Sequence, residues 1–378
     1  MKDFVRQEVF QSCTTVIVKV GTNVLTDDSE RLDSERIEQL AGQLSRVRET
    51  GRRVVLVTSG AVGAGLEILG LSRRPESLPE LQAAAAVGQP SLIQRWDRAL
   101  SACGLRSAQI LLTGNDFRNR QRYLNVRNTL RTLFDYDTIP IVNENDTVSV
   151  QEIALGDNDQ LASMLATLVQ SPLLVILSSV DGLYDGAPSL AESRLIPTVE
   201  RPDESLLQVA STEQSSRGRG GMKSKLRAIL AATGMGETVI LANGRTAGVL
   251  DQIREGEPVG TLFLPQSGAV QAWKRWLGFG APPAGVLVLD SGAVRAVREQ
   301  GRSLLAVGIS TVEGVFEAGA LVALQTAEGS EIARGLANYS SDEIRRIRGR
   351  RSDQIAAALG HVPFGEVIHR DNLSVTRT

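Results

Sequence analysis

The chain has 378 residues, a length that predicts two domains, and its 42% hydrophobic and 22% charged residues are typical of a globular protein. Its 41 basic and 43 acidic residues give a net charge of −2, so the whole chain favours neither nucleic acid nor an anionic membrane. No apolar run approaches the roughly 20 residues of a membrane-spanning helix, and residues 1–12 lack the apolar core of a secretory signal. We therefore expect a cytoplasmic protein without membrane contact.

Cysteine and histidine are scarce, which argues against several kinds of site. Cys13 and Cys103 are the only cysteines, so a disulfide framework and a cysteine-rich zinc site are excluded. The only histidines are His361 and His369, so the rest of the chain has no histidine for a catalytic triad or metal centre. Only five of the 41 basic residues are lysine. A lysine in a glycine-rich turn is therefore a candidate for a crowded phosphate site, where a compact ammonium fits better than a guanidinium.

Short β-branched apolar runs alternate with helical patterns through the first two-thirds of the chain. This alternation predicts the α/β class, with a mainly parallel open sheet sandwiched by helices, in a catalytic domain over residues 1–266. The expected strands are residues 14–20, 52–59, 108–113, 138–143, 173–179 and 237–243, and the expected helices lie near 33–50, 78–103, 157–170 and 222–234.

The pattern changes after Pro265. Residues 267–282 contain two of the three tryptophans and read as a connector. From Gly285 short strands separated by glycine turns predict a small β-rich barrel over residues 283–365. Its five clustered arginines are a candidate RNA-binding patch, with a solvated helix face as the alternative; they are Arg345, Arg346, Arg348, Arg350 and Arg351.

The first motif with chemical meaning is VKVGTNVL, in which a strand ends at Lys19 and turns through Gly21. Backbone amides in such a turn can point at phosphate oxygens, and Lys19 adds a positive charge. The alternative is a strand end whose lysine reaches solvent.

The second motif is VTSGAVGAG at residues 57–65, a strand that runs into a glycine-rich helix start. Its glycines follow G-x-x-G-x-G rather than the dinucleotide fingerprint G-x-G-x-x-G. Ser59 and neighbouring amides could hold a carboxylate or phosphate. The alternative is that the small residues permit close packing of a helix on a strand.

The third motif is a polar cluster at residues 142–166. Asn143 to Asp146 follow a strand, and Gly156 to Asp159 open a helix. Such residues commonly form turns and helix caps. Two clusters at the ends of core elements exceed what capping requires, and they could bind an amino group and position a cation-rich reaction centre.

The fourth motif is SRGRGGMKSKLRAILAA at residues 216–232, a glycine-rich loop that feeds a helix. Lys223 and Lys225 lie at the start of that helix, where cations are unfavourable unless an anion is bound. The motif therefore indicates a phosphate ligand, with a surface loop as the alternative.

Taken in order, these motifs resemble the glutamate 5-kinase family of the amino acid kinase superfamily. The resemblance includes LQAAAAVGQP at 81–90 and RYLNVRNTL at 122–130, and the C-terminal part resembles a PUA domain. It implies the amino acid kinase fold and transfer of the ATP γ-phosphoryl group to the side-chain carboxylate of L-glutamate, the first step of proline biosynthesis.

The resemblance also implies roles for individual residues. Lys19 and Lys225 match catalytic lysines, and Asp159 is expected to hold their two ammonium groups in place. The expected glutamate site consists of Ser59, Asp146, Asn158 and Asp157. The expected ATP site consists of Lys19, Gly21, Ser178, Ser179, Arg219, Gly220, Gly221, Met222, Lys223, Ser224 and Lys225.

One departure concerns the nucleotide site: the family often has Thr-Asp where this chain has Ser178-Ser179, with Asp181 two residues later. The resemblance further implies Mg²⁺ bridging the ATP phosphates without protein side-chain ligands, feedback inhibition by proline, and a homo-oligomer, either a tetramer or a dimer. Two alternatives stay open: another amino acid kinase acting on acetylglutamate or aspartate, and an RNA-binding regulatory protein that acts through the PUA-like domain.

Overall fold

The computed structural model forms two compact units, residues 1–267 and 268–378. It describes residues 3–27, 31–148, 158–169, 172–186, 192–209, 221–265, 283–360, 364–370 and 373–375. The expected connector, 267–282, lies outside the described residues, and the expected domain boundaries stay a prediction. None of the described helices is both long enough and apolar enough to span a lipid bilayer.

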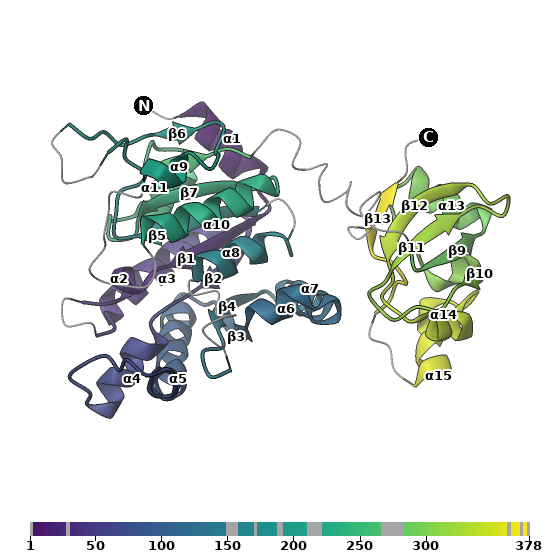
Figure 1. The fold of residues 1–378 in the computed structure, drawn as a ribbon, viewed down its shortest axis with the longest axis horizontal. Coiled ribbons are helices and arrows are strands. Elements are labelled where there is room, and N and C mark those ends of the chain that lie inside the picture. The colour runs from purple at the N-terminus through teal and green to yellow at the C-terminus, as the bar shows by residue number, and fades with distance from the viewer. Residues whose placement is uncertain are drawn as a thin grey trace. The chain divides into compact units, whose positions relative to one another are not determined.

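The first unit is built on an eight-stranded sheet with the order β3-β4-β2-β1-β5-β7-β8-β6 (Figure 1). Every pairing is parallel except β7 with β8, so the predicted mainly parallel sheet is confirmed. The strands are β1 Thr15–Val20, β2 Arg53–Val57, β3 Arg106–Leu112, β4 Thr138–Glu144, β5 Pro172–Ser178, β6 Thr198–Val199, β7 Thr238–Asn243 and β8 Thr261–Phe263.

Helices cover both faces of this sheet. The helices are α1 Phe4–Ser12, α2 Thr22–Leu25, α3 Ser34–Glu49, α4 Ala61–Leu69, α5 Leu78–Ala102, α6 Gly114–Arg118, α7 Arg120–Asp135, α8 Asn158–Ala166, α9 Leu206–Val209, α10 Met222–Gly234 and α11 Val249–Glu255. Val16 and Val18 of β1 pack in a core with α3, α5 and α11, whereas Ile17 packs in a second core with α8 and α10. Because side chains alternate along a strand, Lys19 lies on the same face as Ile17, under α8 and α10.

Gly65 of the second motif serves a packing role between two helices, together with Gly88. A Cβ atom on Gly65 would lie 1.8 Å from the carbonyl oxygen of Ala84, and one on Gly88 would lie 1.9 Å from that of Ala61. Helices α4 and α5 therefore approach each other more closely than any other residue would allow. The expected contact of a helix with a strand is wrong, because the close partner is another helix.

Arg6 connects the N-terminal helix α1 to the far edge of the sheet. Its side chain is only 2% exposed, and burial lowers the pKa of its guanidinium. The guanidinium donates hydrogen bonds to the carbonyl oxygens of Pro197, Val259 and Gly260 at 2.6, 2.6 and 3.0 Å. These bonds compensate for the burial of a charged group.

The second unit contains a five-stranded sheet with the order β10-β9-β11-β12-β13, which confirms a small β-rich unit. Its elements are β9 Gly285–Leu289, α13 Ser291–Arg298, β10 Ile309–Glu313, β11 Leu321–Gln325, β12 Glu331–Leu336, α14 Ser341–Ile347, α15 Ile355–Leu359 and β13 Leu373–Val375. Strand β13 pairs with β12, so this sheet extends beyond residue 365.

The arginine cluster of the second unit makes contacts within the unit itself. Arg345, Arg346 and Arg348 each donate a hydrogen bond to a backbone carbonyl oxygen of that unit. All five arginine side chains are exposed. Three of the five side chains therefore tie α14 to neighbouring segments.

Candidate active site

The candidate site lies where the carboxyl ends of the parallel strands meet. Strand β1 is central, with β2 on one side and β5 on the other, and the chain order of the strands reverses at this point. Ligands of open α/β sheets bind outside the carboxyl ends of the strands at such a point. The residues of the first three motifs follow β1, β2 and β4, so the topology brings them to one edge.

Three charged side chains come together at this edge and are almost completely buried. Lys19 Nζ lies 2.6 Å from Asp159 Oδ1, and Lys225 Nζ lies 3.2 Å from Asp159 Oδ2. The exposed fractions are 3% for Lys19, 0% for Asp159 and 8% for Lys225. One carboxylate thus holds two ammonium groups, and the alternative in which Lys19 reaches solvent is wrong.

Each of the three side chains is positioned by its place in an element. Lys19 is the penultimate residue of β1 and faces α8, Asp159 is in the first turn of α8, and Lys225 is in the first turn of α10. Helices α8 and α10 pack against each other over the sheet (Figure 1). The group carries a net charge of +1 where water is scarce, and the N-terminus of α10 adds partial positive charge. Such a place favours an anion.

A chain of hydrogen-bonded polar side chains lies at the ends of β2 and β4. Asn158 Nδ2 donates to Ser59 Oγ at 2.9 Å and to Asn143 Oδ1 at 3.1 Å. Asn143 Nδ2 in turn donates to Gln89 Oε1 at 2.8 Å. Ser59 directly precedes Gly60, the N-cap of α4, whose φ of +107° is a left-handed conformation that turns the chain from β2 into that helix.

The structure brings some of the expected ATP-site residues close to the lysines. Gly21 directly follows β1, and a Cβ atom there would lie 3.6 Å from Lys19 Nζ. Gly221 is the N-cap of α10. Ser178 is buried at the end of β5, whereas Ser179 is exposed.

For the other expected site residues the structure gives the exposure of the side chain, or they lie outside the described residues. Lys223 is exposed, although it lies only two positions from Lys225. Met222 packs beside the core under α10, and Ser224 is half-buried. Asp146 is half-buried in the turn after β4. Asp157, Arg219 and Gly220 lie outside the described residues.

Asp181, which follows the departure at Ser178-Ser179, is held at the same edge of the sheet. Asn243 Nδ2 donates to Asp181 Oδ1 at 2.9 Å, and the Tyr184 hydroxyl donates to Oδ2 at 3.1 Å. Desolvation, together with this carboxylate, raises the pKa of the Tyr184 hydroxyl. An oriented acidic side chain therefore exists near the end of β5, two residues later than the family pattern places it.

Gln89 is the member of this site that the sequence did not identify. It lies on α5 and meets a residue 54 positions later in the chain. No periodicity or spacing connects two such positions. In the sequence analysis Gln89 was included in the stretch LQAAAAVGQP but was assigned no role. Its position directly after Gly88 was the one available signal, because that glycine marks where α5 contacts α4.

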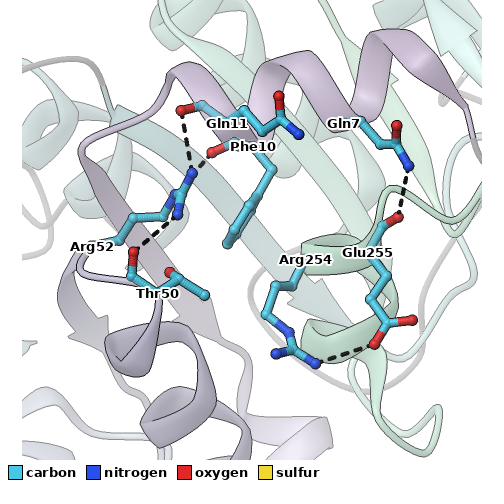
Figure 2. Close-up of a pocket in the computed structure, with 7 residues that line it drawn as sticks. All are labelled: Gln7, Phe10, Gln11, Thr50, Arg52, Arg254 and Glu255. Carbon is cyan, nitrogen blue, oxygen red and sulfur yellow. Dashed lines mark hydrogen bonds and ion pairs between the residues drawn. The ribbon is translucent and has the colours of Figure 1, made fainter.

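A hollow at the opposite edge of the sheet contains two arginines that contact neighbouring residues. It has a volume of about 530 Å³ and is lined by Gln7, Phe10, Gln11, Thr50, Arg52, Arg254 and Glu255 (Figure 2). Arg52 donates to the carbonyl oxygens of Phe10, Gln11 and Thr50, and Arg254 contacts Glu255 at 3.2 Å. These contacts close the C-terminal end of α1 onto its neighbours, which is a structural role.

Among the described residues, no group of three or more His, Cys, Asp or Glu side chains could hold a metal ion. Asp159, the buried acid of the site, has an ammonium group at each of its oxygens.

Comparisons with known proteins identify the family of the chain and agree with this fold. The model of the amino acid kinase family matches residues 14–243, and that of the PUA domain matches residues 285–359. A glutamate 5-kinase of Rhodopirellula baltica is 45% identical over 371 residues, covering 98% of this chain and 95% of the relative. A glutamate 5-kinase of Thioalkalivibrio sulfidiphilus is 46% identical over 358 residues, covering 94% and 96%. A solved carbamate kinase from Giardia lamblia bound to AMP-PNP has a TM-score of 0.50 at 19% identity, over 68% of this chain and 100% of that one, which shows the fold alone.

Proposed function

The chain belongs to the glutamate 5-kinases of the amino acid kinase family, and we propose from this that it transfers the γ-phosphoryl group of ATP to the side-chain carboxylate of L-glutamate. The product is glutamyl 5-phosphate, and the reaction is the first step of proline biosynthesis. The observation that carries the proposal is the pair of buried ammonium groups on Asp159 at the carboxyl edge of the sheet.

The chemistry of the step fits a site without histidine. A carboxylate is already a competent nucleophile, so no general base is required. The difficulty is the repulsion between two anions, because the carboxylate approaches a phosphoryl group that is itself negatively charged. Lys19 and Lys225 would neutralise the charge on the phosphoryl oxygens, and Asp159 would keep both ammonium groups in position.

We propose Mg²⁺ as the divalent cation, bound to ATP phosphate oxygens. The donor set fits this arrangement, because both oxygens of Asp159, the buried acid of the site, are already in contact with lysines. When bound, the cation adds positive charge to the phosphates. Lys19 and the N-terminus of α10 supply the corresponding charge from the protein side.

Glutamate would lie beside the chain of polar side chains at the ends of β2 and β4. Ser59 and Asn158 are hydrogen-bonded to each other there. Asp146 lies two residues after the end of strand β4, which contains Asn143. The resemblance to the family also supports proline as a feedback inhibitor, a homo-oligomer and a cytoplasmic location. The alternative RNA-binding function is not favoured, because the relatives that match nearly the whole chain are glutamate 5-kinases.

The test is an assay of purified protein with ATP, Mg²⁺ and L-glutamate, in which hydroxylamine traps the acyl phosphate. Lys225→Ala should abolish glutamate-dependent hydroxamate, because it removes one of the two buried cations. Arg227→Ala is the matched control, since Arg227 is an exposed cation on the same helix. Parallel reactions with aspartate and acetylglutamate test the substrate. Turnover of another acid in place of glutamate would refute the substrate assignment, and full activity of Lys225→Ala would refute the site.

A further inference from the structure

One backbone amide fixes the direction of the hydrogen bonds in the polar chain at the candidate glutamate site. The N–H of Glu144 donates to Asn143 Oδ1 at 2.9 Å, and a backbone N–H can only donate. Asn143 must therefore turn its Nδ2 toward Gln89, which must answer with the acceptor Oε1. By the same reasoning Asn158 must meet Asn143 Oδ1 with its own Nδ2.

With the hydrogen bonds in this direction, one acceptor atom and one donor atom of the polar chain are left without a partner among the described residues. Asn158 Nδ2 donates both of its protons, one to Ser59 and one to Asn143. The other end of this amide, Oδ1, can only accept a hydrogen bond. Asn158 Oδ1 and Gln89 Nε2 are buried and have no hydrogen-bond partner among the residues that the structure describes. Buried polar atoms of folded proteins are nearly always paired, so two unpaired atoms in one small network indicate a ligand.

We propose that Gln89 is a positioning residue which, through Asn143, holds the amide of Asn158 so that Oδ1 faces the substrate and selects a dicarboxylate with a hydrogen-bond donor on its α-carbon. The α-ammonium group of glutamate is such a donor. Without an acceptor at Gln89, the Asn143 amide loses the partner of its Nδ2, and its hold on Asn158 weakens. The inference rests on the proposed function and names the group that distinguishes glutamate from a plain dicarboxylate.

The backbone that carries Gln89 is well placed for such a role. Gly88, directly before it, lies against the carbonyl oxygen of Ala61 at the start of α4. Helix α4 begins two residues after Ser59, which receives a hydrogen bond from Asn158. Both ends of the polar chain are therefore attached to a single pair of closely packed helices, which keeps their spacing constant.

The experiment compares glutamate with glutarate, which has the same length but no α-ammonium group. Gln89→Leu removes the acceptor at similar size, whereas Gln89→Glu keeps an acceptor for Asn143. Gln94→Leu is the matched control, because Gln94 is an exposed residue of the same helix α5. The measurements are the KM values for glutamate and ATP, kcat/KM with glutarate, and the rise in melting temperature that each dicarboxylate causes in the absence of ATP.

Gln89→Leu should raise the KM for glutamate about tenfold, the effect of losing one hydrogen bond to a charged group. It should leave the KM for ATP and kcat/KM with glutarate within about twofold, because the lost interaction involves the α-ammonium group alone. The glutamate-specific rise in melting temperature should shrink in parallel. Gln89→Glu should keep the preference for glutamate, and Gln94→Leu should behave as the unsubstituted protein.

Three results would overturn the inference. They are an unchanged preference for glutamate in Gln89→Leu, an equal loss with glutamate, glutarate and ATP, and a loss in Gln89→Glu as large as that in Gln89→Leu. A wild-type protein that neither phosphorylates nor binds glutamate would overturn the proposed function together with this inference. Normal wild-type activity combined with one of the three results would overturn the role of Gln89 alone.

Discussion

Replacing Asp159 by asparagine tests whether one carboxylate organises the two lysines. The substitution keeps the shape of the side chain but removes the charge that lies 2.6 Å from Lys19 Nζ and 3.2 Å from Lys225 Nζ. Both lysines are nearly inaccessible to solvent, so water cannot replace the lost partner. Removing one member of a buried ion pair costs about 3–5 kcal/mol of stability, because it leaves uncompensated buried charge. We expect a decrease in the free energy of unfolding within that range.

Turnover should fall further than the loss of folded protein explains. Displacing an ammonium group from the transferring phosphoryl group should reduce kcat on the order of 10²- to 10³-fold, the effect of losing one electrostatic contact to a reaction centre. Binding should respond in the opposite direction. Without Asp159 the two cations repel each other, so the phosphates of ATP become their best partner. ATP with Mg²⁺ should therefore raise the melting temperature of Asp159→Asn by more than it raises that of the wild type.

The assay is hydroxamate formation at saturating ATP and glutamate, with melting temperatures measured by scanning fluorimetry with and without ATP. Asp135→Asn serves as the control, since Asp135 is an exposed acid at the end of α7. A kcat of Asp159→Asn within about threefold of the wild type would refute the assigned role, because a threefold change corresponds to less than 1 kcal/mol.

Two further predictions concern stability. Burial raises the pKa of Glu237, just before β7, to about 8 from an ordinary 4.5, so the stability linked to its protonated form is complete below pH 4.5 and is lost as the pH rises toward 8. Glu237→Gln should therefore raise the free energy of unfolding at pH 7 by up to about 3 kcal/mol over the wild type and should give no gain at pH 4.5. Chemical denaturation at several pH values across this range measures the difference. An equal gain at both pH values would contradict the raised pKa. Gly88→Ala should destabilise the protein by about 3 kcal/mol or more, because its Cβ atom would lie 1.9 Å from the carbonyl oxygen of Ala61. Gly70 is the control position, because a Cβ atom there would meet nothing within 4 Å and only the left-handed backbone opposes it. Gly70→Ala should therefore cost about 1 kcal/mol in the same denaturation experiment. Equal costs for the two variants would argue against the close packing of α4 and α5.

The elements that the sequence predicted best are the buried parallel strands. Strands β1, β5 and β7 lie within one residue of the expected bounds at each end, because strands buried on both faces are continuous apolar runs bounded by polar residues. Helices α3, α5 and α10 also match their expected ranges closely. The short strands β6 and β8 were not expected, since two or three residues leave no periodic pattern.

The candidate site was predicted in its residue types but not in its geometry. Lys223 and Lys225 lie in the same motif, and a helix rotates successive residues by about 100°, so the two side chains point to different sides. Only the second is buried against Asp159. The contact of Gln89 with Asn143 depends on the approach of α5 to the end of β4, which no local pattern encodes. The direction of the amides depends further on a single backbone N–H.

The hydrogen bonds of Arg6 have a consequence for the order of events during synthesis. The side chain near the start of the chain is bonded to carbonyl oxygens 191, 253 and 254 residues later. Until residues 259 and 260 have left the ribosome, the guanidinium lacks two of its three final acceptors. Arg6 can therefore complete its hydrogen bonds only after the segment directly before β8 has been synthesised. The C-terminal end of α1 already has a partner in Arg52, so the start of α1 is the part of the first unit that is completed last, when it joins the segment before β8.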